Sequence, residues 1–179
     1  MTEVSTLFEE FEEKYPSAIT EMSLNRGDFL IRKGQVERYT YFILSGAVAV
    51  KLFKESESHT IRFGYQGSFL NSIPSFFDNS PSYFDIVALR KTKVKAFAKK
   101  SLYELIESNE SYKVVYISVL ENLITHFVER EIDLLASSPA KRYERVLERS
   151  PQLFNEVPLK YIADYLRMSP ETLSRLRKS

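Results

Sequence analysis

Residues 27–54, GDFLIRKGQVERYTYFILSGAVAVKLFK, indicate the fold class of the first half of the chain. This stretch contains three short runs rich in β-branched and aromatic residues. Gly27, Gly34 and Gly46 stand at the ends of these runs, where a chain that turns back on itself needs a bend or a positive φ angle. Short apolar runs separated by such turn residues predict β-strands rather than helices.

The same pattern continues on both sides of this stretch. Further runs occur at residues 59–65 (HTIRFGY), 84–89 (FDIVAL) and 93–99 (KVKAFAK). Residues from about 20 to 100 are therefore predicted to form an all-β sandwich or barrel. Before them, residues 5–15 place Leu7, Phe8, Phe11 and Tyr15 on one face, which predicts a short amphipathic helix that ends at Pro16.

From about residue 101 to 136 the apolar residues recur with helical spacing. One stripe consists of Ile117, Leu120, Ile124, Val128 and Leu135, and a second stripe beside it consists of Tyr116, Val119, Leu123, Phe127 and Leu134. One stripe can cover the β domain while the other pairs with a second copy of the helix. The alternative is a single wide face buried within one subunit. We favour dimerisation, because one small sandwich offers few neighbours to a helix of more than 20 residues.

The remaining residues predict three short helices, at 139–149, 158–166 and 170–178, after a hinge at Ser137–Pro139. In the last two, PLKYIADYLRMSPETLSRLRK, Ser169 is a typical N-cap and Pro170 suits the first helical position. The spacing predicts a helix–turn–helix. Its candidate DNA-binding residues are Ser169, Pro170, Glu171, Thr172, Ser174, Arg175 and Lys178.

The residue types on this last helix suit the major groove of DNA. Ser and Thr hydroxyls can bond phosphates, Arg can contact guanine and Glu can accept from cytosine. Residues 139–179 also carry nine Lys and Arg against five acidic residues, although the whole chain has a net charge of only +1. The alternative is a capped surface helix that binds nothing.

Composition excludes several classes of function. The chain has no Cys, so it holds no disulfide, no thiolate metal site and no Cys nucleophile. His59 is the only histidine in the β region, too few for a two-His, one-carboxylate metal site, and no P-loop or Gly-x-Ser-x-Gly motif occurs. We therefore expect no enzyme activity, no metal and no cofactor. No run suits a membrane span and the N-terminus is acidic, so we expect a cytoplasmic protein that does not associate with membranes.

Two motifs together resemble the Crp/Fnr family of bacterial transcription regulators. Residues 159–178 (LKYIADYLRMSPETLSRLRK) resemble that family's helix–turn–helix. Gly27, Gly34, Gly46 and Gly67, with the strand Tyr41 to Leu44, are similar to the turns and a strand of its cyclic-nucleotide-binding β-roll. The order of β-roll, long helix, hinge and helix–turn–helix also agrees over nearly the whole chain.

The resemblance implies an α+β fold with an N-terminal β-roll (double-stranded jelly roll) that acts as a sensor. Its domains would be residues 1–110 (the β-roll with the N-terminal helix), 111–137 (the dimerisation helix) and 138–179 (the helix–turn–helix domain, with a short or absent wing). Ile117, Leu120, Ile124, Val128 and Leu135 would form the dimer interface. The implied partners are double-stranded DNA, a second copy of the chain, a small-molecule effector and RNA polymerase.

The sequence departs from this family where cyclic nucleotides bind. A gapless alignment places Ser72 and Ser82 where the family has a ribose-binding Glu and a phosphate-binding Arg, and Phe127 and Val128 where a polar pair meets the purine. Cyclic AMP is therefore not the expected ligand, since a buried phosphate would lack its guanidinium partner. The pocket either binds a different, less charged molecule, through Asn71, Ser72, Ser82 and Tyr83 with Phe76 and Phe77, or is filled by its own aromatic side chains.

The tail departs from the family as well. Arg167 stands where the family's turn usually has Gly, and Pro170 stands where the best-known members have a base-reading Arg. Glu171 and Arg175 match the family. The main prediction is a homodimeric, sequence-specific DNA-binding regulator. The alternative is a ligand-sensing or protein-interaction module with a degenerate helix–turn–helix.

Overall fold

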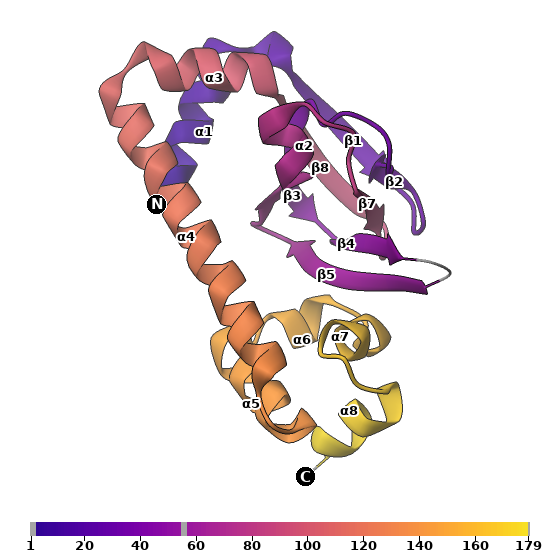
Figure 1. The fold of residues 1–179 in the computed structure, drawn as a ribbon. Helices are drawn as coiled ribbons and strands as arrows, with labels where there is room; N and C mark the ends of the chain where they lie inside the picture. The colour runs from indigo at the N-terminus through magenta and orange to yellow at the C-terminus, as the bar shows by residue number, and fades with distance from the viewer. Residues whose placement is uncertain (1–2, 55–56, 179) are drawn as a thin grey trace.

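The computed structural model describes residues 3–54 and 57–178, and Figure 1 shows their arrangement. The strands are β1 (Ile19–Leu24), β2 (Phe29–Ile31), β3 (Tyr39–Ser45), β4 (Ala47–Lys54), β5 (Glu57–Tyr65), β6 (Phe69–Leu70), β7 (Phe84–Ala88) and β8 (Thr92–Ala98). The α-helices are α1 (Glu3–Lys14), α2 (Ile73–Asp78), α3 (Lys99–Ser108), α4 (Glu110–Leu135), α5 (Pro139–Arg149), α6 (Leu153–Glu156), α7 (Leu159–Tyr165) and α8 (Pro170–Leu176), and a short 3₁₀ turn covers Pro16–Ala18.

The strands form a β-roll of two four-stranded sheets. One sheet has the order β1-β8-β3-β6, the other has the order β2-β7-β4-β5, and neighbouring strands within each sheet are antiparallel. Ile43, Val48, Ile86 and Val94 are fully buried in the core between the two sheets. The predicted α+β fold with a β-roll is therefore confirmed. Strands β1 and β6 were not among the predicted runs.

Gly46 shows why glycine is needed at a turn of this roll. Its φ angle is 92°, in the region that L-residues avoid. A Cβ atom at this position would lie 2.5 Å from the carbonyl oxygen of Lys91 and 2.6 Å from the Cα of Thr92. The tight connection between β3 and β4 therefore excludes any side chain.

Aromatic residues attach the N-terminal helices to the outer face of the first sheet. Phe8 and Phe11 of α1 pack against Phe97 of β8, with ring centroids 4.8 and 5.2 Å apart. Leu102 and Leu105 of α3 belong to the same cluster, and all five of these side chains are buried. The apolar face predicted for residues 5–15 is thus buried, and α1 ends at Lys14, just before Pro16.

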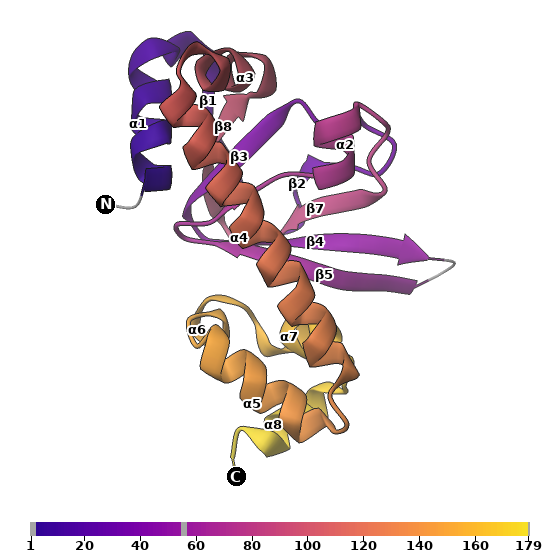
Figure 2. The ribbon, with the colours of Figure 1, turned by 60° about the vertical axis from the view of Figure 1, so that its left-hand side comes forward.

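The helical region after residue 98 consists of two helices. They are separated at Asn109, whose φ of −152° and ψ of 133° are extended rather than helical. The Asn109 side chain accepts a hydrogen bond from the Ser111 amide at 2.9 Å and so caps α4. Figure 2 shows α4 running from α3 along the roll to the C-terminal helices, so one helix links the two ends of the molecule.

The C-terminal helices α5–α8 share their core with the roll. Buried Val146, Leu153, Ile162 and Leu173 form one cluster with Ala47 and Ala49 of β4, and half-buried Phe63 of β5 packs against it. The three predicted short helices are present, and α6 is an additional turn. None of the described helices is both long and apolar enough to cross a membrane.

Candidate functional site

Helix α8 presents a polar face next to a well-formed N-cap. The Ser169 hydroxyl accepts a hydrogen bond from the Thr172 amide at 3.2 Å, and Pro170 occupies the first turn. Glu171 and Arg175 are exposed. Hydrogen bonds from the backbone amide and from the Ser169 hydroxyl hold the pKa of Glu171 below its usual value. The candidate residues are Ser169, Pro170, Glu171, Arg175 and Lys178, which are exposed, and Thr172 and Ser174, which are half-buried.

The turn between α7 and α8 is a Schellman motif. The Met168 amide donates to the Ala163 carbonyl at 3.0 Å, and the Arg167 amide donates to the Asp164 carbonyl at 3.1 Å. Arg167 has a φ of 55°, so the left-handed conformation expected at this position is present on a non-glycine residue. This motif ends α7 abruptly, and four residues, 166–169, separate it from α8.

Helix α7 is held directly against the roll. The Thr60 amide of β5 donates to Asp164 Oδ2 at 2.6 Å, and Phe63 packs on Tyr165 with ring centroids 5.3 Å apart. Arg90, just after β7, forms an ion pair with Glu156 of α6. Contacts with the β-roll therefore set the orientation of α6 and α7.

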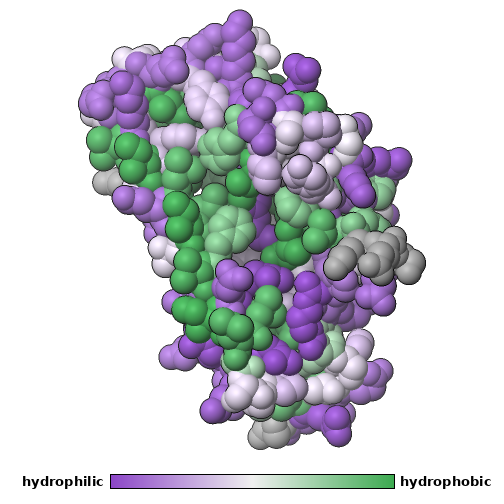
Figure 3. Space-filling view, viewed as in Figure 1, coloured by the Kyte–Doolittle hydropathy of each residue, from purple (hydrophilic) through white to green (hydrophobic). Residues whose placement is uncertain are grey.

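Helix α4 carries a column of exposed apolar side chains. Figure 3 shows it as a green band along the side of the molecule that α4 occupies. Its exposed members are Val114, Ile117, Ile124, Phe127, Val128, Ile132 and Leu135. Of the predicted dimer residues, Leu120 is half-buried and Ile117, Ile124, Val128 and Leu135 are at least half exposed. In the second stripe, Tyr116, Val119, Leu123 and Leu134 are half-buried, and Phe127 is exposed.

Ser72 and Ser82 lie together, fully buried. Their hydroxyl oxygens are 2.6 Å apart, and the Ser82 hydroxyl also donates to the Phe84 carbonyl at 2.7 Å. Glu37, only 1% exposed, occupies the space beside them and accepts from the Ser72 amide at 3.1 Å. The Tyr41 hydroxyl donates to the same carboxylate at 3.1 Å. Burial raises the pKa of Glu37, although these hydrogen bonds oppose the effect.

The other predicted pocket residues do not gather around this pair. Asn71 donates to the Thr40 hydroxyl at 3.1 Å and lines two small hollows beside α4. Phe127 lines one of these hollows, Tyr83 is 59% exposed, and Val128 lies on the exposed stripe. Phe76 is buried in the aromatic cluster under α1 and α3, whereas Phe77 is 43% exposed beside the second hollow.

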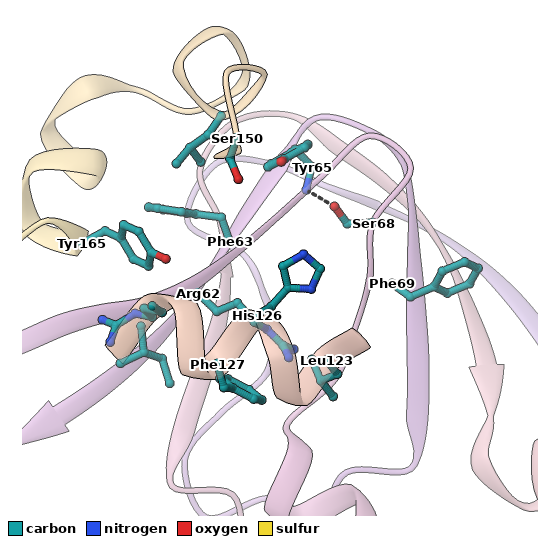
Figure 4. Close-up of a pocket in the computed structure, with 13 residues that line it drawn as sticks. Arg62, Phe63, Tyr65, Ser68, Phe69, Leu123, His126, Phe127, Ser150 and Tyr165 are labelled. Carbon is teal, nitrogen blue, oxygen red and sulfur yellow. Dashed lines mark hydrogen bonds between the residues drawn. The ribbon is translucent and has the colours of Figure 1, made fainter. Parts of the chain in front are cut away.

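A larger cavity of about 320 Å³ lies where the roll, α4 and the C-terminal helices meet. Figure 4 shows His126 projecting from α4 into it, with Phe63 and Tyr65 coming from β5 and Tyr165 from α7. Arg62 and Arg130 also line it. The Arg130 guanidinium lies 4.8 Å from the centroid of the Tyr165 ring, and its Nη2 is 3.4 Å from the Thr60 carbonyl oxygen.

Sequence analysis did not single out Glu37, Arg62 or Arg130. Each is a charged residue within an otherwise ordinary strand, turn or helix pattern, and its burial depends on residues far away in the chain. One signal was available for Arg62, since a charge interrupts the apolar run IRFGY at residues 61–65. That signal alone does not distinguish a buried cation from one on the solvent face of an edge strand.

Comparisons with known proteins agree with this architecture. Residues 21–109 match the family model of the cyclic nucleotide-binding domain. The match covers most of the β-roll and helix α3. A search of curated proteins gave no sequence match for the chain.

Solved structures resemble the chain over most of its length. FixK2 from Bradyrhizobium japonicum has a TM-score of 0.72 and 18% identity over 89% of this chain and 83% of its own. The regulator CLP of Xanthomonas campestris has a TM-score of 0.70 and 15% identity over 97% of this chain and 90% of its own. A cyclic nucleotide-binding domain containing protein from Listeria monocytogenes has a TM-score of 0.71 and 15% identity over 99% and 89%. The structural neighbours include Crp/Fnr-type transcription regulators, and at these identities the likeness establishes the fold.

Proposed function

We propose that this chain is a homodimeric, sequence-specific DNA-binding transcription regulator whose β-roll responds to a signal other than cyclic AMP. The observation that carries the proposal is the exposed polar face of α8, which follows α7 after a Schellman turn. The fold shared with Crp/Fnr-type regulators supports the same assignment. RNA polymerase remains a further proposed partner.

The residues of α8 suit distinct roles on a duplex. The hydroxyls of Ser169, Thr172 and Ser174 would bond phosphates near the helix N-terminus, where the helix dipole favours negative charge. Arg175, one turn further on, would reach a guanine edge with two hydrogen bonds, and Glu171 would accept from a cytosine amino group. In a dimer joined through the exposed stripe of α4, two copies of α8 would enter major grooves about one helical turn apart.

The surroundings of Ser72 support a signal other than a cyclic nucleotide. The buried Glu37 carboxylate accepts from the Ser72 amide, and Ser72 and Ser82 bond to each other. A cyclic phosphate placed here would meet the Glu37 carboxylate, which opposes its charge, and Ser82 stands where the family has its phosphate-binding Arg. The Arg62 guanidinium nearby donates to the Asn71 carbonyl at 2.9 Å. In this region the protein's own side chains already satisfy the polar groups.

The proposal predicts the effect of removing Arg175. On the cognate site, Arg175→Ala should weaken binding by about 1–3 kcal/mol and relax the base preference at one position. Fluorescence anisotropy with the cognate duplex and with duplexes changed at each position measures both effects. Lys178→Ala is the control, because a phosphate contact should weaken binding about equally on all sequences and flatten its salt dependence.

One observation favours the alternative, a sensing or protein-interaction module with a degenerate helix–turn–helix. Arg167 carries the strained left-handed conformation that the family's turn usually gives to glycine. Salt distinguishes the two functions, because binding through several phosphates weakens steeply as salt rises. Binding of a partner protein by α8 with little dependence on salt, and no affinity for duplex DNA, would establish the alternative.

A further inference from the structure

The arginines of α5 are engaged within the chain. Arg142, Arg145 and Arg149 are three and four residues apart, so they share one face of the helix, which we call its arginine face. All three side chains are half-buried and contact other helices. The excess of Lys and Arg in residues 139–179 therefore overstates the charge available to DNA, and the arginine face has an internal role.

Two of these arginines bind a pair of acidic residues on α4. Asp133, only 1% exposed, forms ion pairs with Arg145 Nε at 2.9 Å and with Arg149 Nη2 at 2.5 Å. Glu129, one turn earlier, forms an ion pair with Arg145 Nη2 at 3.0 Å and lies 3.7 Å from Arg149 Nη1. Two carboxylates thus meet two guanidinium groups. Because a buried carboxylate without these partners is costly, the cluster holds the end of α4 against α5.

Arg142 connects a third helix to the same place. Its Nε donates to the carbonyl of Leu166, the C-cap of α7, at 2.9 Å. Its Nη1 donates to the carbonyl of Ala136, the C-cap of α4, at 3.3 Å. The carbonyl ends of helices carry partial negative charge and attract cations. One side chain therefore joins the ends of α4 and α7, just before the turn that leads to α8.

Apolar packing contributes little to this connection. The buried core of α5–α8 is shared with β4, and none of its described members comes from α4. Arg130 of α4 adds a contact with the Tyr165 ring of α7, 4.8 Å from its centroid. Three residues, 136–138, link α4 to α5 along the chain, and Figure 2 shows α5 beside the end of α4. Charged side chains therefore hold the end of α4 to the C-terminal helices.

We propose that the arginine face of α5 fixes the angle between α4 and α8, and so selects the spacing of the two half-sites that a dimer recognises. In a two-fold dimer joined through α4, this angle sets how far apart the two copies of α8 lie. Turning α8 about Ser137–Pro139 would separate Asp133 from its partners, so the segment expected to be a hinge is held at one angle. The spacing role rests on the proposed function, whereas the fixed angle is tested without DNA.

The first measurement is the distance between spin labels on α4 and α5, by double electron–electron resonance. The chain has no Cys, so Asn122→Cys and Glu144→Cys, both at exposed positions, introduce the only labelled sites. Refolding with an excess of unlabelled chain restricts the measurement to distances within one chain. The wild-type background should give one narrow distribution. Asp133→Asn should broaden it, because the amide keeps the volume of the side chain and loses its charge.

The second measurement is the affinity for duplexes whose half-sites are moved apart by one base pair. This change shifts one half-site by about 3.4 Å and rotates it by about a tenth of a turn. The wild type should lose at least about tenfold in affinity, comparable to the loss of one base contact. Asp133→Asn should lose less than about threefold. A variant that merely unfolds more easily would instead bind both duplexes more weakly by the same factor.

Two further variants locate the effect. Arg149→Met keeps an apolar stem but removes one partner of Asp133, so it should reproduce both changes, and it replaces Asp133→Asn if that variant does not fold. Glu131→Gln is the matched control. It makes the same change from carboxylate to amide at an exposed position of α4, two residues before Asp133, and should behave as the wild type in both measurements.

The two claims can fail separately. A narrow wild-type distribution that broadens in Asp133→Asn or Arg149→Met, but not in Glu131→Gln, supports the fixed angle even if the chain binds no DNA. A broad wild-type distribution, or no broadening in either variant, overturns it. If the wild type binds no two-fold symmetric duplex, the proposed function fails and the spacing role fails with it. If it binds and both variants keep its discrimination between spacings, the spacing role alone is overturned.

Discussion

Arg167 shows what a single residue contributes to the turn between α7 and α8. Its φ of 55° lets its own amide and that of Met168 satisfy two carbonyls at the end of α7. A non-glycine residue in this conformation costs about 1 kcal/mol. The Arg167 carbonyl also lies 3.4 Å from Arg142 Nη2 of α5. The turn is therefore kept by its hydrogen bonds despite the strain.

Glu37 gives a prediction with a defined pH dependence. Because its pKa is raised by burial, the folded protein holds this proton at pH values where the unfolded chain has lost it. The contribution of Glu37 to stability therefore falls as pH rises above the unfolded value of about 4.5. Glu37→Gln should remove this part of the pH dependence. Urea unfolding at a series of pH values measures it.

The same substitution has a cost at neutral pH. Glutamine replaces one carboxylate oxygen by an amino group, which cannot accept from the Ser72 amide. We expect a loss of about 1–3 kcal/mol in the free energy of unfolding at pH 7. Glu107→Gln on the exposed side of α3 should change stability by less than about 0.5 kcal/mol. A pH profile identical to that of the wild type would contradict the role given to Glu37.

At the scale of residues, caps and turns were predictable from the sequence, whereas contacts between residues far apart in the chain were not. The Ser169 cap and the turn glycines follow from neighbouring residues, so sequence patterns identified them. The burial of Glu37 depends on Ser72 and Tyr41, and the contact of Thr60 with Asp164 joins residues 104 positions apart. No periodic pattern encodes such pairs, and this is why the predicted pocket residues were chosen by resemblance alone.

At the scale of elements, helix α4 gives the clearest prediction. Ile124 is 62% exposed on the proposed dimer stripe. A glutamate at this position would be buried without a partner in a dimer, so Ile124→Glu should raise the dimer dissociation constant at least about 100-fold. Sedimentation equilibrium measures the change.

A matched substitution tests whether the effect belongs to the stripe. Asn122 is exposed and lies two residues away, on the opposite side of the helix. Asn122→Glu introduces the same charge and should leave the dimer intact. Equal weakening by both substitutions, or a wild type that is monomeric at micromolar concentration, would contradict the proposed interface.

The elements differed in how well the sequence predicted them. Strands β3, β4 and β5 are long, strongly apolar runs, and the structure has them within a few residues of the predicted bounds. Strand β6 has two residues and α6 has four, too few for a periodic pattern. Asn109 is a typical N-cap residue, so the break between α3 and α4 could have been predicted. It was missed because the apolar residues on both sides of it keep helical spacing.

At the scale of the whole molecule, the C-terminal helices depend on the roll. Phe63 of β5 packs on Tyr165, so Phe63→Ala should lower the free energy of unfolding by about 2–4 kcal/mol. This loss is somewhat smaller than that expected for a fully buried Phe, because Phe63 is only half-buried. Hydrogen exchange should quicken in α7 and α8 and stay slow in β3 and β8. Phe53→Ala, at a position 42% exposed on β4, is the control and should cost less than about 1 kcal/mol. Unchanged exchange in α7 and α8 of Phe63→Ala would contradict this dependence.

The order of the parts along the chain was predictable, whereas their docking was not. The change from β to helical periodicity indicated a roll followed by a long helix and a helical end. The shared core of β4, β5 and α5–α8, and the cavity beside it, arise only when residues from three separate segments meet.

The central claim is that the docked helix–turn–helix belongs to a dimer that recognises a specific DNA sequence. Selection of binding sites by the purified full-length chain from random double-stranded fragments, at low and at near-physiological salt, tests it most directly. The account predicts one enriched motif with two-fold symmetry and half-sites about one helical turn apart, retained at the higher salt. Enrichment of no motif, with weak binding that disappears as salt rises, would contradict it.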